Sequence, residues 1–266
     1  MSFIARCSVY ITAILGVTAG ACSASVPRPA ALAGAPVECA STTLRSEADV
    51  SAYAACDAVI GDLRIQHSNL TDLKALARLR RVSGTLQISG NPKLDDLTGL
   101  EQLTSVGALE IGQNPELSSL EALRNLRSSP VVRIRDNAEL RTLEGLEGIE
   151  SAESISLERN GIFSTTGLAN LREVGTLVVT HNSKLISLSG LKGLRRATSV
   201  EIRNNPVVAA YFGLLPQLEK VDQQLVLHSN SGLSTAEVRK VLERVERGAE
   251  HPSLEGREGR REASLH

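Results

Sequence analysis

Side chains that commonly carry out chemistry are scarce in this chain and do not converge on one site. Neither a phosphate-binding loop nor a G-x-S-x-G, C-x-x-C or H-E-x-x-H motif occurs among the 266 residues. Carboxylates are plentiful, but most stand at solvent positions between leucines, as in the segment LDDL at 94–97. The histidines near the turns are far apart in the sequence and are interpreted as surface residues: His67, His181 and His228. The sequence therefore predicts no catalytic residue, no metal site and no cofactor.

Asparagine is the polar residue with a regular spacing. Eight asparagines follow one another at intervals of 22 to 25 residues, and a period of this size is typical of a solenoid built from stacked repeats. Each of them ends a short apolar segment, where an inward-turned amide would satisfy backbone groups that the bend leaves unpaired. We interpret all eight as structural residues rather than as ligands: Asn69, Asn91, Asn114, Asn137, Asn160, Asn182, Asn205 and Asn230.

The stretch 84–106 shows what one repeat contains. Its residues Leu86, Gln87 and Ile88 alternate in polarity, which predicts a strand with aliphatic side chains inward, and leucines then recur every three residues. Stacked repeats would form one parallel sheet of eight strands, roughly 34 Å long at about 4.8 Å per strand step. Whether the other side of each coil, such as Leu97–Leu100, is a strand or a helical turn stays open.

The segment before the repeats, residues 39–60, predicts an N-terminal cap. A solenoid needs atypical ends, because its first repeat would otherwise expose a hydrophobic cross-section. Ser46 is a good helix N-cap, and Val50 with Tyr53 would form the apolar face of a short helix.

After the repeats, which occupy residues 61–233, the segment 234–247 predicts a C-terminal cap helix. Ser234 and Glu237 have the spacing of a capping box, and valines follow on one helical face. The unit after Thr198 is looser than the others, with Tyr211, Phe212 and an extra Leu214–Leu215, so a local bulge is expected there. The remaining tail, 248–266, has no core-forming pattern and is expected to be disordered.

The chain begins with an export segment. Residues 1–21 predict a signal peptide, because a single arginine precedes an apolar run too short for a transmembrane helix. The sequence AGAC that follows resembles the lipobox of bacterial lipoproteins, although alanine stands at position 19 where leucine is usual. This resemblance implies lipidation of Cys22, whereas ordinary signal cleavage would leave the same cysteine as a plain N-terminal residue. Residues 22–38 would then be the anchor and a flexible tether.

Two cysteines, Cys39 and Cys56, flank the predicted N-terminal cap. With Cys7 removed in the signal peptide and Cys22 acylated, they remain as one pair. A disulfide across this loop would contribute about 3 kcal/mol and requires the oxidising compartment to which export would deliver the chain. Two free thiols or a metal site are the alternatives, and the second has few further ligands nearby.

The segment CDAVIGDLRI at 56–65 resembles the opening of receptor L-domains, the leucine-rich ligand-binding modules of the insulin and epidermal growth factor receptors. In that family a cysteine, an apolar residue, a glycine and an L-x-I strand follow in the same order. The later repeats, of the form G-x-L-x-I-x-x-N-x-x-L-x-x-L-x-x-L, also resemble bacterial secreted proteins that carry this domain. The resemblance covers about residues 39–245 and implies an α/β solenoid: a right-handed leucine-rich-repeat coil with one parallel sheet and about eight repeats of 22–23 residues. It carries over no ligand-binding residue.

Outward-pointing residues of the strands form the candidate functional surface, in two columns that end at Val226 and His228. Neighbouring charges along these columns could be self-satisfied cross-strand pairs, or they could contact a ligand; Arg133 and Arg135 are the best anchors for a protein. Neither column contains an aromatic residue, which disfavours sugar binding. The candidate partner-binding residues are Arg64, Gln87, Glu110, Arg133, Arg135, Glu158, Glu201 and Arg203.

These features predict a non-enzymatic binding module of the bacterial cell envelope, either periplasmic or surface-exposed. It would be held at the membrane by an N-terminal lipid and would present its sheet to a protein partner. The alternative is an envelope spacer or adhesin that acts through its length or through self-association. A net charge of −1 disfavours nucleic acid as a partner, and a small-molecule ligand is not expected.

Overall fold

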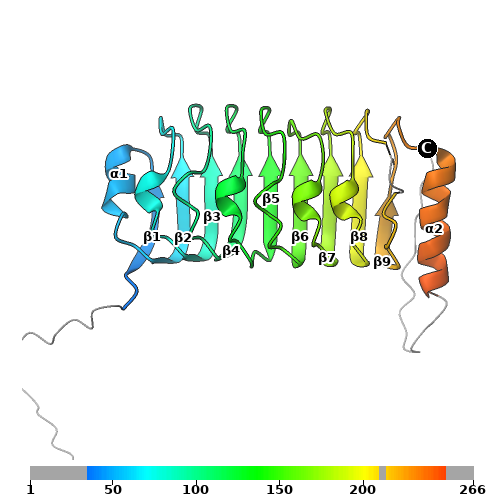
Figure 1. Cartoon of the computed structure of the whole chain (residues 1–266), viewed down its shortest axis with the longest axis horizontal. Helices are drawn as coiled ribbons and strands as arrows, with labels where there is room; N and C mark the ends of the chain where they lie inside the picture. Colours follow the sequence, from blue (N-terminus) through cyan, green and yellow to red (C-terminus); the bar gives the residue numbers. More distant parts are fainter. Residues whose placement is uncertain (1–34, 210–213, 250–266) are drawn as a thin grey trace, which may run out of the picture. The chain divides into compact units, whose positions relative to one another are not determined.

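The computed structural model of the chain describes residues 35–209 and 214–249. The predicted signal peptide, the predicted anchor Cys22 and residues 250–266 of the predicted tail lie outside the described residues, as does most of the predicted tether. The predicted disorder of the first two tail residues, Gly248 and Ala249, is wrong, because they belong to the C-terminal helix. Within the described part, one parallel sheet runs through the chain in sequence order, each strand pairing with the next (Figure 1). Its strands are β1 Glu38–Leu44, β2 Ala58–Gln66, β3 Arg81–Ser89, β4 Ser105–Gly112, β5 Val131–Arg135, β6 Ser151–Glu158, β7 Glu173–Thr180, β8 Arg196–Arg203 and β9 Lys220–Val226. The predicted solenoid with a single parallel sheet is therefore confirmed.

The inward residues of the strands stack on equivalent residues of the neighbouring strands. Leu86 and Ile88 of β3, for example, pair in register with Leu109 and Ile111 of β4, and all four are at most 1% exposed. Leucines on the other side of each coil meet them, so that one continuous aliphatic core runs along the solenoid. This period-two alternation explains why the strands were predictable from sequence.

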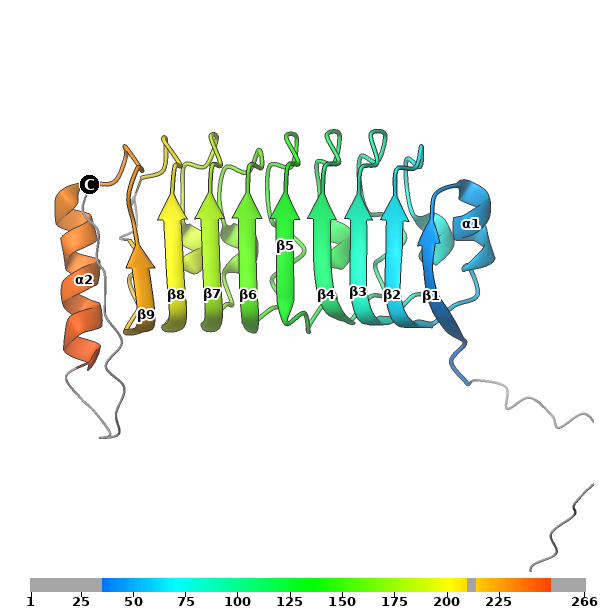
Figure 2. The same ribbon diagram turned by 180° about the vertical axis from the view of Figure 1, so that it is seen from behind.

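The side of the coils opposite the sheet is built from tight turns. Four coils contain a 3₁₀ helix among the described residues: η1 Lys74–Leu76, η2 Glu121–Leu123, η3 Thr166–Leu168 and η4 Ser189–Leu191. Isolated bridges join Ser164 to Ser187 and Ser187 to Ala209 without forming a named strand. The question that the sequence left open therefore has no single answer: four coils have a short helical turn, whereas the segment 97–100 is a hydrogen-bonded turn without a helix. In Figure 2 the strands lie in front of these turns, so the sheet face is uncovered there.

Seven buried asparagines form a continuous hydrogen-bonded ladder at the strand ends. Each donates its Nδ2–H to a carbonyl of the preceding coil, as Asn91 does to Ile65 (3.0 Å). Each Oδ1 after the first accepts the backbone N–H of the preceding ladder asparagine, as that of Asn114 does from Asn91 (3.0 Å). The members are at most 6% exposed: Asn91, Asn114, Asn137, Asn160, Asn182, Asn205 and Asn230.

The prediction of Asn69 as the eighth ladder residue is wrong by one position. Asn69 is exposed, and Ser68, which is 2% exposed, occupies the ladder instead. The Ser68 hydroxyl donates to Asn91 Oδ1 at 2.7 Å, and its backbone N–H donates to the same oxygen at 3.0 Å. Ser68 begins the ladder, and no earlier ladder residue among the described residues presents a backbone N–H to its side-chain oxygen.

The N-terminal cap contains a strand that the sequence did not reveal. Strand β1 pairs with β2, and only Leu44 among its residues is buried, so the alternation that marks the other strands is missing. Helix α1 Glu47–Ala52 follows, with the predicted N-cap Ser46 accepting the N–H of Asp49. The predicted disulfide between Cys39 and Cys56 is present, with its Cα atoms 5.9 Å apart. It ties the first strand to the entrance of the second.

The C-terminal cap is helix α2 Thr235–Ala249, which packs on β9. Its predicted capping box is formed: the Glu237 N–H donates to the Ser234 hydroxyl (3.2 Å), and the Ser234 N–H donates to the Glu237 carboxylate (2.9 Å). Val238, Val241 and Val245 lie on one helix face and are at most 8% exposed. The open end of the sheet is therefore covered by an amphipathic helix.

Candidate partner-binding face

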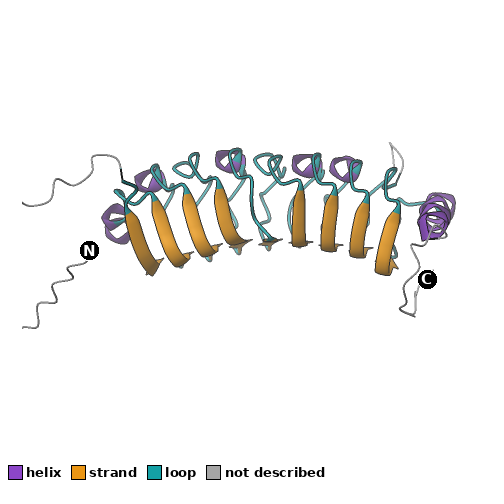
Figure 3. Ribbon diagram, turned by 90° about the horizontal axis from the view of Figure 1, so that it is seen from below, coloured by secondary structure: helices purple, strands orange, loops and turns teal. Residues whose placement is uncertain are grey.

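The two predicted columns of outward residues lie in register across the sheet. Arg64, Gln87 and Glu110 are successive partners in one column, which continues through Arg133 to Glu201. The second column places Arg135 beside Glu158 and ends its paired part at Arg203. Figure 3 shows the strands on the inner side of a shallow arc, so these residues face a mildly concave surface. The predicted outward position of Val226 is wrong: this residue is buried, with 9% of its surface exposed, in β9, the strand on which α2 packs.

Charges on this face form a mixture of cross-strand and same-strand pairs. The predicted neighbours Glu110 and Arg133 form an ion pair across strands at 2.7 Å, and Glu201 pairs with Arg203 on β8. Arg64 pairs at 2.6 Å with Asp62, a partner that the sequence reasoning did not include. These side chains are half exposed, so each pair adds at most about 1 kcal/mol to stability.

The predicted neighbours Arg135 and Glu158 do not pair with each other. Each instead contacts the residue that follows it in the chain, just beyond the end of its strand: Arg135 lies 3.5 Å from Asp136, and Glu158 lies 3.6 Å from Arg159. Asp136 and Arg159 in turn form a two-bond contact at 2.6 and 3.2 Å. The hydrogen bond from Arg159 lowers the pKa of Asp136 below its usual value, and the same contact raises the pKa of Arg159. This four-residue chain crosses the rim of the sheet.

The rim has a distinctive backbone that brings these charges outward. The residue before each ladder position has a positive φ, including Asp136 at 57° and Arg159 at 52°. A non-glycine residue in this region carries a steric cost, which the ladder hydrogen bonds offset. Sequence reasoning missed this row because its side chains share no chemical type; their signal is only the position before the ladder asparagine.

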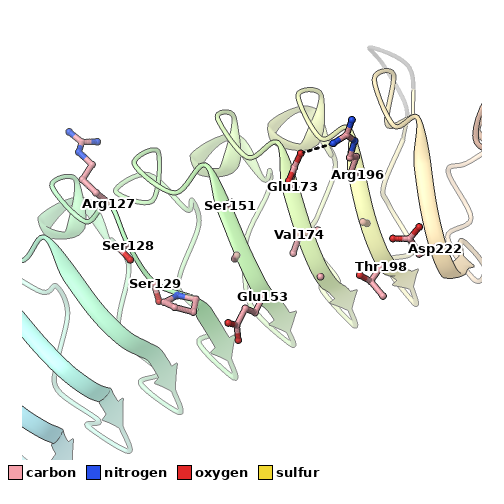
Figure 4. A pocket seen from close by; sticks show the side chains of 14 residues that line it. Arg127, Ser128, Ser129, Ser151, Glu153, Glu173, Val174, Arg196, Thr198 and Asp222 are labelled. Atoms are coloured by element: carbon pink, nitrogen blue, oxygen red, sulfur yellow. Dashed lines mark hydrogen bonds and ion pairs between the residues drawn. The ribbon is translucent and has the colours of Figure 1, made fainter. Parts of the chain in front are cut away.

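A groove crosses the first halves of β6, β7 and β8 on the same side of the protein (Figure 4). Its volume is about 600 Å³. Its ends are marked by the segment 127–130 and by Asp222, and none of the predicted partner-binding residues lines it. We call it the bend groove, because it lies where each strand bends before entering the paired columns.

The groove arises from a one-residue difference in the length of this bend. In β3 Val82 and Thr85 are three residues apart, whereas their partners in β4, Val106 and Ala108, are only two apart. The bend of β3 is therefore one residue longer. There Asp62 Oδ1 accepts the N–H of Thr85 at 2.8 Å. The longer bend returns in β9, where Val221 and Gln224 lie opposite residues of β8 that are only two apart. This register shift is not the looseness predicted around Tyr211, Phe212 and Leu214–Leu215, which falls largely outside the described residues and stays a prediction. Strands β6, β7 and β8, which the groove crosses, all have the shorter bend.

The turn side of the coils has a different character. A cleft of about 390 Å³ there is lined by acidic side chains, among them Asp95, Asp96 and Glu121.

Across the described ranges 35–209 and 214–249, no three His, Cys, Asp or Glu side chains are arranged to hold a metal ion. His181 contacts Asn204 of the next coil at 3.1 Å, and His228 contacts Ser229 of its own turn at 2.9 Å. In the same part of the chain, no helix is long and apolar enough to cross a membrane.

The fold and the face define a leucine-rich-repeat-type solenoid with an open sheet surface. A family model, that of the receptor L domain, matches residues 41–147, which run from β1 through the β5 coil. No curated protein and no solved structure matches the chain. Receptor L domains are non-enzymatic domains that bind protein ligands, so the match supports a binding module.

Proposed function

We propose that this protein is a non-catalytic module that binds a protein partner through the face of its parallel sheet. The observation that carries the proposal is the arrangement of the eight predicted face residues, which lie in two in-register columns on an uncovered surface. A face fixed by strand pairing and by the buried asparagine ladder loses little conformational freedom on binding, and such preorganisation favours affinity.

Arg133 and Arg135 are the proposed centre of this face. Both side chains are half exposed, at 51%, and they project from the short strand β5 in the middle of the sheet. Arginine is enriched at the energetic centres of protein interfaces, because its planar group forms several hydrogen bonds and packs on apolar surface. Each arginine here already holds one carboxylate, which orients it toward a partner.

We further propose that the protein acts at the bacterial cell envelope, where lipidation of Cys22 would anchor it. The export segment and the AGAC sequence at 19–22 support this, and the disulfide of the N-terminal cap agrees with an oxidising compartment. The test is metabolic labelling with an alkyne fatty acid in the wild type and in Cys22→Ser. Label in the wild type alone supports the anchor, and absence of label from both contradicts it.

The partner-binding proposal is tested by photo-crosslinking in intact cells. A photoreactive residue replaces Arg133 on the face, and a matched probe replaces Asp95, which is exposed on the turn side. We expect a discrete adduct from position 133 alone, and the same adduct should disappear in a second variant, Arg135→Glu. Adducts from neither position would contradict binding and favour a structural spacer. Adducts to the protein itself from both positions would indicate self-association.

A further inference from the structure

The bend groove contains none of the predicted face residues, and its lining combines small side chains with charged ones. We propose that it receives an extended peptide segment of the partner, with a lysine or arginine side chain of that segment opposite Glu153. This inference rests on the proposed function and specifies it, because it names the form of the partner and a second contact region.

The length of the groove fits a short extended peptide. From Pro130 before β5 to Asp222 in β9 it crosses the sheet. Those four strand steps amount to roughly 19 Å at about 4.8 Å each, which is the span of about six extended residues at about 3.3 Å each. The volume of about 600 Å³ also lies within the range of ordinary ligand sites.

The surface of the groove allows a peptide backbone to approach closely. Its deepest residues are small or aliphatic, and Val174 and Ala197 are at most 4% exposed. Hydroxyl side chains stand along it, among them Ser151 and Thr198, and such groups can donate to or accept from main-chain amides. No aromatic residue is among those that line it, so a ligand that needs stacking is disfavoured.

Within the described residues, two charged side chains of the groove form no ion pair: the carboxylate Glu153 and, at one end, the guanidinium Arg127. Glu173 pairs with Arg196 at 3.4 Å, as Figure 4 shows, and Asp222 pairs with Lys220 at 3.0 Å. Glu153 is exposed between them and Pro130, and no cationic side chain of residues 35–209 or 214–246 lies within ion-pair distance of it. A cationic side chain on the peptide would complete the alternation of charge along the groove.

The test is selection from a library of random twelve-residue peptides displayed on phage, with the full chain immobilised in detergent. Selected peptides are then labelled, and their Kd is measured by fluorescence anisotropy. We expect a lysine or arginine at one recurring position. Glu153→Lys should raise the Kd about tenfold or more, because like charges would then face each other. The matched control is Glu116→Lys, which makes the same charge change at an exposed site outside the groove and should leave Kd unchanged.

A second variant, Ser151→Trp, fills the groove without changing its charge and should weaken the same peptides by at least tenfold. The inference is overturned if no peptide is selected, or if Glu153→Lys and Ser151→Trp both bind with wild-type Kd. It is also overturned if only Arg135→Glu reduces binding, and that result would leave the proposed sheet face intact. Failure of the proposed function itself is recognised separately, by the absence of any crosslink from position 133.

Discussion

Replacing one asparagine in the middle of the ladder should be among the most damaging single substitutions in the protein. Asn137 is completely buried. Its Nδ2 donates to the carbonyls of Ile111 (3.2 Å) and Arg135 (3.0 Å), and its Oδ1 accepts the backbone N–H of Asn114 (3.1 Å). Its Nδ2 also donates to Asn160 Oδ1 (3.2 Å), and its Oδ1 also accepts from Asn114 Nδ2 (3.4 Å). Alanine would remove all five contacts.

The size of the effect follows from the groups left without a partner. In Asn137→Ala the Asn114 N–H and the Ile111 carbonyl both lose a buried hydrogen bond, and each such loss costs about 1–3 kcal/mol. We therefore expect the free energy of unfolding to fall by about 4 kcal/mol for the two groups together. The measurement is urea denaturation followed by far-UV circular dichroism, with the slope checked for loss of two-state behaviour, which repeat proteins can show.

The matched control is Asn69→Ala, which removes the same amide from an exposed position. It should change the free energy of unfolding by no more than about 0.5 kcal/mol, as ordinary surface substitutions do. The reasoning would be refuted if Asn137→Ala lost less than about 1 kcal/mol, the value of one ordinary hydrogen bond. Equal losses in the two variants would refute it as well, because they would show that burial in the ladder is not what matters.

Three further predictions concern the cap, the rim and the coil packing. Cys39→Ser should lower the free energy of unfolding by about 3 kcal/mol, measured by urea denaturation, and reduction of the wild type should reproduce the loss. The pKa of Asp136 is lowered in the folded state, so the stabilisation that its charged form provides is complete above the unfolded pKa of about 3.9 and is lost as the pH falls through the folded pKa. Asp136→Asn should therefore be less stable than the wild type at pH 7. The difference between the urea midpoints of the two proteins should close in acid. Gly190→Ala places a Cβ 1.6 Å from the Thr165 carbonyl oxygen and should lower the melting temperature strongly. In Gly112→Ala the new Cβ meets only the Arg135 side chain at 3.2 Å and its backbone at 3.3 Å, so the melting temperature should fall by a few degrees at most. Similar melting temperatures for the two variants would contradict the packing.

The fold was predictable because a repeated core requires the same residue types at equivalent positions of every repeat. Each coil needs aliphatic residues at the same inward positions and a polar side chain at the same bend, so the period is visible without a structure. The errors occurred where this demand is weak. Strand β1 buries only Leu44, so it lacks the alternating pattern of the other strands. Ser68 and Asn69 are adjacent polar residues, and the sequence alone does not show which of them points inward.

The site was less predictable, for two physical reasons. Strand register correctly placed Arg135 beside Glu158. Exposed side chains, however, have several nearby partners of similar energy, and here each contacts the residue that follows it in the chain. The bend groove depends on a difference of one residue. The signal was present in the sequence, because Val82 precedes its strand leucine by four positions and Val106 precedes its own by three. Its meaning required knowing which strands are neighbours.

The asparagine ladder also makes the length of this protein adjustable in whole coils. Every interior coil presents the same acceptor and the same donor to its neighbours, so excision of residues 114–136 would bring Asn137 into the place of Asn114. Duplication of such a 23-residue segment would lengthen the sheet by one strand, about 4.8 Å, without requiring a new fold. Gain or loss of coils in evolution would therefore be constrained less by folding than by what the sheet displays, and the bend groove would shorten or lengthen with it.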